Sequence, residues 1–376
     1  MWIVAGLAGL AVVVTGELPL DAAREVGLTR GGPIMVFLVA ITVVAELSDR
    51  AGVFDAAARL CARAAHGSTV RLFLLIAGLG TLTTIGMSLD TTAVLLTPVV
   101  LSLSEQLKMR PLPFALLAVW LANTASLLLP VSNLTNLLAL QREHLTTVAF
   151  AVRMALPEVA AVVITVGYLA VLFRRDLRGR YTPAPAPPAV DPWTFRVCAL
   201  ACAALAPEVL LGVPPWAAAL PCALAAVTVW AIRARSNLSW SLLPWRLVVL
   251  TEGLFLAVTA LARHGVTDLL ASFAGTSALH TAATAAVASN AVNNLPAYLA
   301  VEPAIPPGHT TQLLGALLGT NTGPLVLLWG SLATLLWRER CQARGVHISA
   351  ARFAAVGLGG VPLVLLGTWA ALLATS

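Results

Sequence analysis

Four short stretches of the sequence bring uncharged hydrogen-bonding side chains into otherwise apolar surroundings. They read "SLDTT" from Ser88, "NTASLLLPVSNLTN" from Asn123, "SNAVNN" from Ser289 and "TNTGPLVLLWGS" from Thr320. Amides and hydroxyls can both donate and accept hydrogen bonds, so together they can bind a small polar molecule without a fixed charge. We therefore predict one shared binding site. Its candidate residues are Ser88, Asp90, Thr91, Thr92, Asn123, Ser132, Asn133, Thr135, Asn290, Asn293, Asn294, Asn321, Thr322 and Ser331.

Two carboxylates in apolar stretches are candidates for proton coupling. Asp90 lies in the first polar stretch, and Glu252 lies inside the apolar segment 244–262. A carboxylate at bilayer depth costs roughly 3 kcal/mol unless it is solvated or paired, so such residues often carry protons or bind cations. Each also has an interpretation without proton coupling. Asp90 would then lie near the membrane surface and bond within its hairpin, and Glu252 would form a structural pair.

The composition around these residues is that of a membrane protein. Of the 376 residues, 59% are hydrophobic and 11% are charged, against about 25% charged in soluble domains. The apolar runs span 1–16, 33–47, 70–104, 112–140, 145–173, 193–210, 216–232, 244–262, 277–302, 310–337 and 350–375. They lack the period-two alternation of barrel strands, so we predict an all-α polytopic membrane protein.

Arginine-rich loops predict how the chain is oriented. The clusters at 174–180, 233–235 and 338–344 are cytoplasmic by the positive-inside rule, whereas the loops 17–30 and 301–309 lie outside. The formal charge of +6 is therefore an orientation signal, and we predict no nucleic-acid partner. Neither a metal site nor a cofactor is predicted, because the histidines are scattered and the cysteines show no CxxC spacing.

A proline- and alanine-rich run divides the chain into two related halves. "YTPAPAPPAV" from Tyr181 predicts an extended linker over 181–192, between a first repeat at 1–180 and a second at 193–376. A constant offset of 198 residues pairs the polar stretch at Asn123 with the one at Asn321. The last helix of the first half must end inside and its counterpart must start inside, so the copies are predicted to be inverted. Inverted repeats are typical of secondary transporters.

Each half is predicted to contain one re-entrant hairpin and one broken crossing helix. The hairpins span 70–104 and 277–302, and the broken helices span 112–140 and 310–337. Prolines next to the polar stretches free backbone groups at the breaks. Polar side chains also pack between membrane helices in general, but their coincidence with breaks in both halves favours a binding site near the bilayer midplane.

The polar stretches also carry a family resemblance. "LDTTAVLLTPVVLSL", "PVSNLTNLLAL", "ASNAVNNLPAYLAVEP" and "GTNTGPLVLLWGSLATLLWRE" resemble the arsenite and antimonite efflux permease (ArsB) family of the ion transporter superfamily. The hairpin reads "SLDTT" where an Asn-Asp-Gly-like tip is typical, and it keeps the aspartate at Asp90. The resemblance implies a scaffold domain with an elevator-like transport domain in the bacterial cytoplasmic membrane. It also implies export of arsenite or antimonite by proton antiport and a soluble ATPase as a candidate partner.

The residues can also be compared with the needs of three other functions. A dicarboxylate or sulfate carrier would use positive charge at the site, and the four polar stretches contain no Lys or Arg. A sodium/proton antiporter would use Asp90 and the asparagines as cation ligands, and the residues allow this. An intramembrane enzyme would need a motif such as GxSxG or HExxH, which the sequence lacks. We therefore predict a transporter and no enzyme.

Overall fold

The computed structural model describes residues 2–182, 191–233, 238–261, 263–264, 272–273, 275 and 277–375. Within these ranges the chain is helical, apart from turns, loops and one isolated bridge between Ser68 and Arg180. This confirms the predicted all-α class. Most of the predicted linker lies outside the described residues. Its last residues are ordered, because Asp191 caps the next helix by accepting from Thr194 N and Oγ1, and these hydrogen bonds lower the pKa of Asp191.

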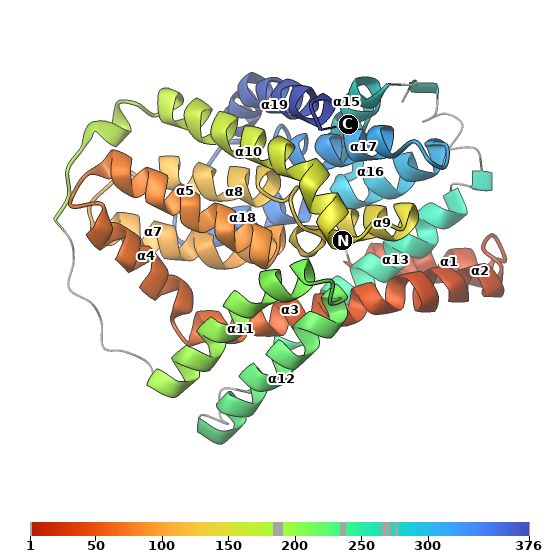
Figure 1. Cartoon of the computed structure of the whole chain (residues 1–376), viewed down its shortest axis with the longest axis horizontal. Helices are drawn as coiled ribbons and strands as arrows, with labels where there is room; N and C mark the ends of the chain where they lie inside the picture. The colour runs from red at the N-terminus through yellow and green to blue at the C-terminus, as the bar shows by residue number, and fades with distance from the viewer. Residues whose placement is uncertain are drawn as a thin grey trace.

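The helices follow one another in a similar order in the two halves (Figure 1). The first half contains α1 (Trp2–Val14), α2 (Leu20–Arg24), the π-helical η1 (Glu25–Arg30), α3 (Gly31–Arg50), α4 (Val53–Ala64), α5 (Thr69–Gly86), α6 (Leu89–Thr91), the π-helical η2 (Thr92–Leu96), α7 (Thr97–Gln106), α8 (Leu112–Thr124), η3 (Pro130–Ser132), α9 (Leu134–Glu143), α10 (Thr147–Leu172) and η4 (Asp176–Arg178). The second contains α11 (Pro192–Leu210), α12 (Pro215–Arg233), η6 (Trp240–Leu242), α13 (Trp245–Leu261), α15 (Ala278–Val292), α16 (Asn294–Val301), η8 (Glu302–Ala304), α17 (Thr310–Thr322), α18 (Leu332–Ala343) and α19 (Ala350–Leu373).

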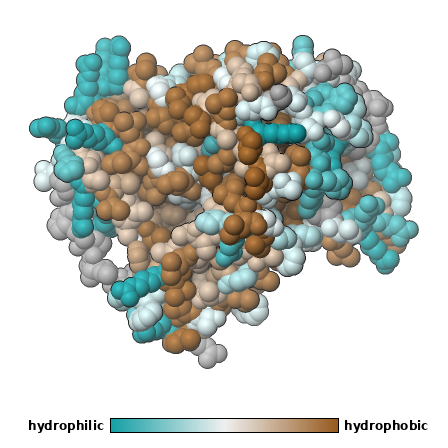
Figure 2. Space-filling model, viewed as in Figure 1, coloured by the Kyte–Doolittle hydropathy of each residue, from teal (hydrophilic) through white to brown (hydrophobic). Residues whose placement is uncertain are grey.

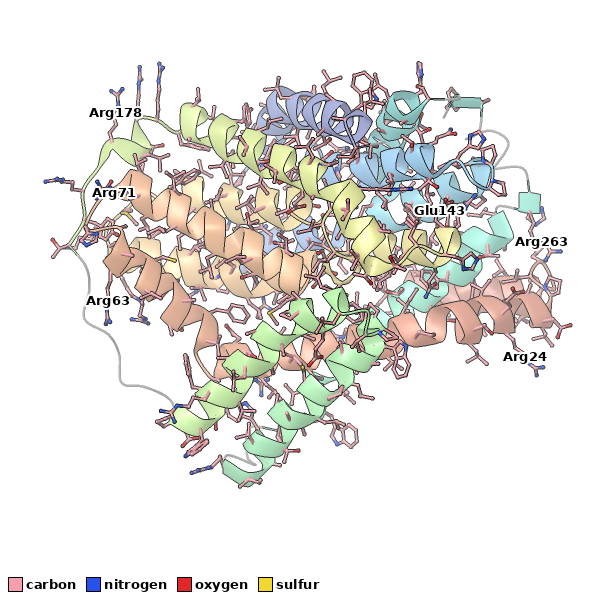
Figure 3. The ribbon with its side chains drawn as sticks, viewed as in Figure 1. Arg24, Arg63, Arg71, Glu143, Arg178 and Arg263 are labelled. Atoms are coloured by element: carbon pink, nitrogen blue, oxygen red, sulfur yellow. The ribbon has the colours of Figure 1, made fainter. Side chains whose placement is uncertain are left out.

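The surface has the distribution expected of a membrane protein. Six helical stretches in the described part of the chain are long and apolar enough to cross a bilayer. Figure 2 shows hydrophobic residues over the middle of one face and hydrophilic residues gathered at its two ends. Arg178 and Arg24, which were predicted to lie on opposite sides of the membrane, lie at opposite ends of the molecule (Figure 3). The hydrophobic band therefore fits a bilayer that is crossed several times.

The helices form two groups. In Figure 1 the lower group, called here the α3 group, contains α1, α3, α11, α12 and α13. Within it α1 packs along α13, and α12 packs along α3. Small residues permit the first contact, because a β-carbon on Gly9 would lie 2.7 Å from Gly253 Cα. The other group, called the hairpin group, contains α5 to α10 and α15 to α19.

The two predicted hairpins are present as helix–turn–helix elements. In the first, α5 ends at Gly86 and the chain returns through α6, η2 and α7. In the second, α15 and α16 meet at Asn293, whose φ of 88° is in the left-handed region that side chains other than glycine rarely adopt. Figure 1 shows α5 and α7 at the left of the hairpin group and α15 and α16 at the right.

The second hairpin packs on α17 through a ladder of small residues. Gly315 and Gly319 of α17 and Gly323 directly after it are four residues apart, and they face α15 at Ala278, Ala282 and Ala286. A β-carbon on Gly319 would lie 2.7 Å from Ala285 Cβ. Backbone-to-backbone approach of this kind is how helices gain van der Waals contact in a membrane, where hydrophobic association is weak.

Replacing Gly319 by valine is expected to push α15 away from α17. Overpacking of this kind costs about 1–3 kcal/mol, so the variant should unfold at a lower temperature in detergent. Gly78→Val is the matched control, because a β-carbon at Gly78 on α5 would meet nothing within 4 Å. Equal melting temperatures for the two variants would contradict this packing.

The two predicted broken helices are α8 with α9 and α17 with α18. Between α8 and α9 the chain runs through an irregular loop, 125–133, that contains η3. Between α17 and α18 it runs through a second loop, 323–331. Pro130 and Pro324 lie in these loops, where a missing amide cannot disrupt a helix. Both loops lie inside the hairpin group, so their polar groups need partners from neighbouring elements.

Candidate functional site

The amides of the two broken helices meet in a buried network. Asn321, at the end of α17, is fully buried. Its Oδ1 accepts from Asn133 Nδ2 at 2.9 Å and from Thr135 Oγ1 at 3.0 Å. Its Nδ2 donates to Asn136 Oδ1 at 3.0 Å. The end of α17 is therefore joined to the beginning of α9, although these residues are about half a chain apart in sequence.

The same network holds the loop 125–133. Asn136 Nδ2 donates to Ser126 O at 2.7 Å and to Leu129 O at 3.0 Å. Asn133 caps α9 by accepting from the backbone amide of Thr135 at 3.2 Å. These bonds satisfy backbone groups that the break in the helix leaves without helical partners. The asparagines of "PVSNLTN" therefore shape the break as well as join the two halves.

The second loop is held by the second hairpin. Asn290 Oδ1 accepts from the amides of Val326 and Leu327, at 3.2 and 2.9 Å. Asn290 Nδ2 donates to Gly323 O at 2.8 Å. Asn293 Nδ2 donates to Trp329 O at 3.1 Å, which ties the tip of the hairpin to the same loop. The side chains of Asn290 and Asn293 thus bind backbone groups of the loop 323–331.

The remaining predicted residues bond within or between neighbouring elements, or are buried. The hydroxyl of Thr322 donates to Leu318 O, that of Ser132 to Ile85 O, and that of Ser331 pairs with Thr334 Oγ1. Thr92 pairs with Thr84 at 2.9 Å, Asn123 Nδ2 donates to Val119 O, and Asn294 is buried in the second hairpin. Asn123 Oδ1 is buried, and it has no hydrogen-bond partner in the described part of the chain.

Ser88, Asp90 and Thr91 line a cavity of about 190 Å³ between the α3 group and the hairpin group. The tip of the first hairpin forms one wall, and α3 from Phe37 to Glu46 forms the facing wall. Val131, Leu134, Leu247 and Leu336 complete the lining with residues of the first loop, α9, α13 and α18. The cavity is thus enclosed by elements from both halves of the sequence.

Asp90 is the most unusual residue of this cavity. Ser88 caps the short helix α6 by accepting from Thr91 N at 3.2 Å, which places Asp90 in its first turn. Asp90 Oδ1 is buried and accepts no hydrogen bond from any described residue. The π-helical turn η2 follows directly, and such turns are frequent at functional sites. The carboxylate is therefore available to a ligand or a proton.

Glu46 is a second acid in the same cavity, and our sequence prediction did not include it. Its Oε1 accepts from Arg50 Nε and NH2 at 3.1 and 2.9 Å, one turn further along α3. Because Glu46 lies near the end of an apolar run and beside this arginine, it resembles an ordinary surface ion pair in sequence. Only the packing of the hairpin tip against α3 reveals its position in the cavity.

Glu252, the second proton-coupling candidate, lies apart from this cavity. Its carboxylate packs against Gly27 of η1 and Gly31 of α3, and a side chain at Gly27 would overlap it. Glu252 Oε2 is buried and has no hydrogen-bond partner among the residues that the structure describes. Asp90 and Glu252 are therefore not brought into one site by this arrangement.

Comparisons with known proteins agree with this architecture. The family model described as "Citrate transporter" (CitMHS) matches residues 1–334. The chain is 30% identical to the arsenical pump membrane protein of Yersinia enterocolitica over 370 residues, which cover 89% of this chain and 84% of the relative. It is also 30% identical to the arsenical pump membrane protein of Escherichia coli K12, with the same coverage. The chain belongs to the CitMHS citrate transporter family and to the arsenical pump membrane proteins.

A solved structure supports the fold of this arsenical pump family member. The YdaH transporter of Alcanivorax borkumensis superposes with a TM-score of 0.58 at 16% identity, covering 94% of this chain and 89% of that one. This likeness concerns the fold alone. Together, the family membership and the apolar helices establish a multi-pass membrane transporter of the bacterial cytoplasmic membrane and confirm the predicted resemblance and location.

Proposed function

We propose that the protein is a secondary active transporter that exports arsenite or antimonite in exchange for protons. The observation that carries this proposal is a cavity whose lining includes Ser88, Thr91 and the acids Asp90 and Glu46. Its lining, as far as the structure describes it, contains no Lys or Arg. Arsenious acid is a neutral trihydroxide near pH 7, so hydroxyl and carboxylate partners suit it. The arsenical pump membrane proteins that the chain resembles point to the same class of substrate.

Asp90 would couple the substrate to the proton. Its unpartnered oxygen can either accept a hydrogen bond from a hydroxyl of the substrate or bind a proton. Binding of the proton therefore weakens binding of the substrate, and the reverse. Such competition at one carboxylate produces exchange, because the loaded and protonated forms alternate.

The proposed movement is a displacement of the hairpin group against the α3 group, as in an elevator. The cavity lies at the boundary between them, so displacement would expose it to one side and then to the other. The hairpins at opposite ends of the group support the proposed pair of inverted repeats (Figure 1). The soluble ATPase stays a prediction of the resemblance.

A sodium/proton antiporter is the second candidate, because two carboxylates in one cavity are typical cation ligands. A citrate carrier receives less support, although the family model has that description. A citrate anion would bind best to positive charge, which the described lining of the cavity lacks.

Transport into everted membrane vesicles distinguishes these functions. Arsenite, antimonite, sodium and citrate are each supplied under an imposed proton gradient, acidic inside. We expect uptake of arsenite and antimonite that collapses when the gradient is dissipated. Uptake of sodium alone, or of citrate alone, would overturn the proposal. Vesicles without the protein provide the background rate.

Substituting Glu46 by glutamine is expected to lower proton-driven transport several-fold without abolishing it. The change removes one of the two acids of the cavity and the negative partner 2.9 Å from Arg50. Glu105→Gln is the control, because Glu105 is an exposed acid at the end of α7. A Glu46→Gln rate equal to that of the control would remove Glu46 from the site.

A further inference from the structure

Glu158 is a buried acid that neither the cavity nor the amide network uses. It lies on α10 and is 3% exposed. Its Oε2 accepts from Leu127 N at 2.9 Å. Its Oε1 is buried and has no partner within the described ranges. A carboxylate in this position thus anchors the loop 125–133 and keeps one oxygen unused.

No described charge neutralises this acid. Helix α10 packs against α5, α8, α11 and α19. Helix α8 has no titratable residue, and Arg71 and Arg352 lie in the first turns of α5 and α19, far along the helices from the loop. The other titratable residues of α10 have partners elsewhere: Arg153 lines a separate cavity, and Tyr168 donates to Val356 O. On α11, Arg196 stacks on Trp193, and Cys198 and Cys202 contact α3. Glu208 of α11 lies near Cys222 of α12.

The second half performs the same task with a neutral group. Offsetting by 198 residues places Leu127 and Leu128 opposite Leu325 and Val326. There Asn290 Oδ1 accepts hydrogen bonds from the amides of Val326 and Leu327, and the side chain of Asn290 cannot ionise. Glu158 of α10 thus holds one amide of the first loop, and Asn290 of α15 holds the two amides that follow the corresponding residue, Leu325, in the second loop. The acid therefore adds a property that anchoring alone does not require, which is reversible proton binding.

The anchored loop leads directly to the cavity. Val131 of this loop lines the cavity beside Asp90, and Asn133 at its end bonds to Asn321. On its other side, Thr165 of α10 donates to Thr124 at the end of α8, two turns from Glu158. A change at Glu158 would therefore alter the loop that separates α8 from α9 and forms part of the cavity wall.

We propose that Glu158 is a second proton-binding residue whose protonation releases the 125–133 loop and so links proton binding to opening of the cavity. This rests on the proposed proton-coupled transport. As a carboxylate, Glu158 accepts a charge-assisted hydrogen bond from Leu127 N, and such bonds are roughly twice as strong as neutral ones. When Oε1 binds a proton, the charge is lost and this bond weakens. The proton returns to water when the loop closes again, so one proton is bound and one released per cycle.

Glu158→Gln tests this directly, because glutamine keeps an acceptor for Leu127 N and cannot titrate. In vesicles we expect arsenite transport by Glu158→Gln to depend less on pH than that of the wild type, because only Asp90 still titrates, while its melting temperature stays near that of the wild type. Glu208→Gln is the matched control, an acid-to-amide change on α11, and it should keep the wild-type pH profile. A Glu158→Gln profile that follows the wild type would overturn the proposal while leaving arsenite export intact.

Infrared difference spectroscopy of the purified protein gives a readout that needs no substrate. Lowering the pH should produce carbonyl bands of buried protonated carboxylic acids, and the component that belongs to Glu158 should be missing in Glu158→Gln but present in Glu208→Gln, whereas the component of Asp90 should remain in both. If wild-type vesicles move neither arsenite nor antimonite, the proposed function fails, and the Glu158 component still decides the role of that residue. Identical bands in both variants would refute it.

Hydrogen exchange of the wild-type protein tests the proposal even if Glu158→Gln does not fold. After correction for intrinsic exchange rates, amides of the loop 125–133 should be well protected at high pH and lose protection as the pH falls. The loop 323–331, held by Asn290, should show no such change. Protection of the first loop that is independent of pH would overturn the proposal.

Discussion

Vesicles that contain Asp90→Asn are expected to show no net transport driven by a proton gradient, while exchange of substrate across the membrane continues. Asparagine preserves the shape and an acceptor oxygen, so a substrate hydroxyl can still bind beside Ser88 and Thr91. It cannot bind a proton in the physiological range, so the competition that drives antiport is lost. The measurement is uptake of arsenite with and without an imposed gradient, together with exchange of labelled substrate at zero gradient.

Asp55→Asn is the matched control for this experiment. Asp55 is an exposed aspartate in the first turn of α4, outside the cavity. Transport by this variant should follow the gradient as in the wild type. If Asp90→Asn retained full coupling as well, Asp90 would have no part in proton transfer, and Glu158, Glu46 or Glu252 would have to carry it.

The second large effect is expected from Asn321→Leu. This change removes the acceptor for Asn133 and Thr135 and the donor to Asn136 in a fully buried position. Each buried polar group left without a partner costs about 1–3 kcal/mol, so the total loss should be about 3 kcal/mol or more. We expect a clear drop in melting temperature in detergent and no transport, because α17 is no longer joined to α9.

The adjacent residue offers a control for burial. Thr322 is as buried as Asn321, but its hydroxyl donates only to Leu318 O of its own helix. Thr322→Val should therefore retain most of the stability and transport. A similar loss in both variants would mean that the end of α17 is merely sensitive to substitution and that the network does not join the two halves.

Asn133 illustrates how far the residues alone could lead. Its position after Pro130, in a polar stretch within an apolar run, correctly predicts a broken helix and a buried polar group. We predicted it as a substrate ligand, which stays a prediction. In this structure its amide group bonds to Asn321. A residue that binds substrate and one that joins helices need the same side chain, so the sequence cannot distinguish them.

Glu46 and Glu158 were missed for a different reason. Glu46 is followed one turn later by Arg50, and Glu158 follows Pro157, so both resemble ordinary residues of helices in the sequence. Their roles depend on what packs against them: the tip of the first hairpin for Glu46 and the loop after α8 for Glu158. Those contacts join segments about 30 to 45 residues apart, and no local pattern records them.

By itself the sequence determined the bilayer setting, the all-helical class and the positions of the breaks, because hydropathy, proline and glycine act over one or two turns. Only the tertiary structure decided that Ser88, Asp90 and Thr91 face α3 across a cavity, while Asn133 and Asn321 bond to each other. The physical reason is that a buried polar group must find a partner. Which partner it finds depends on how distant helices cross.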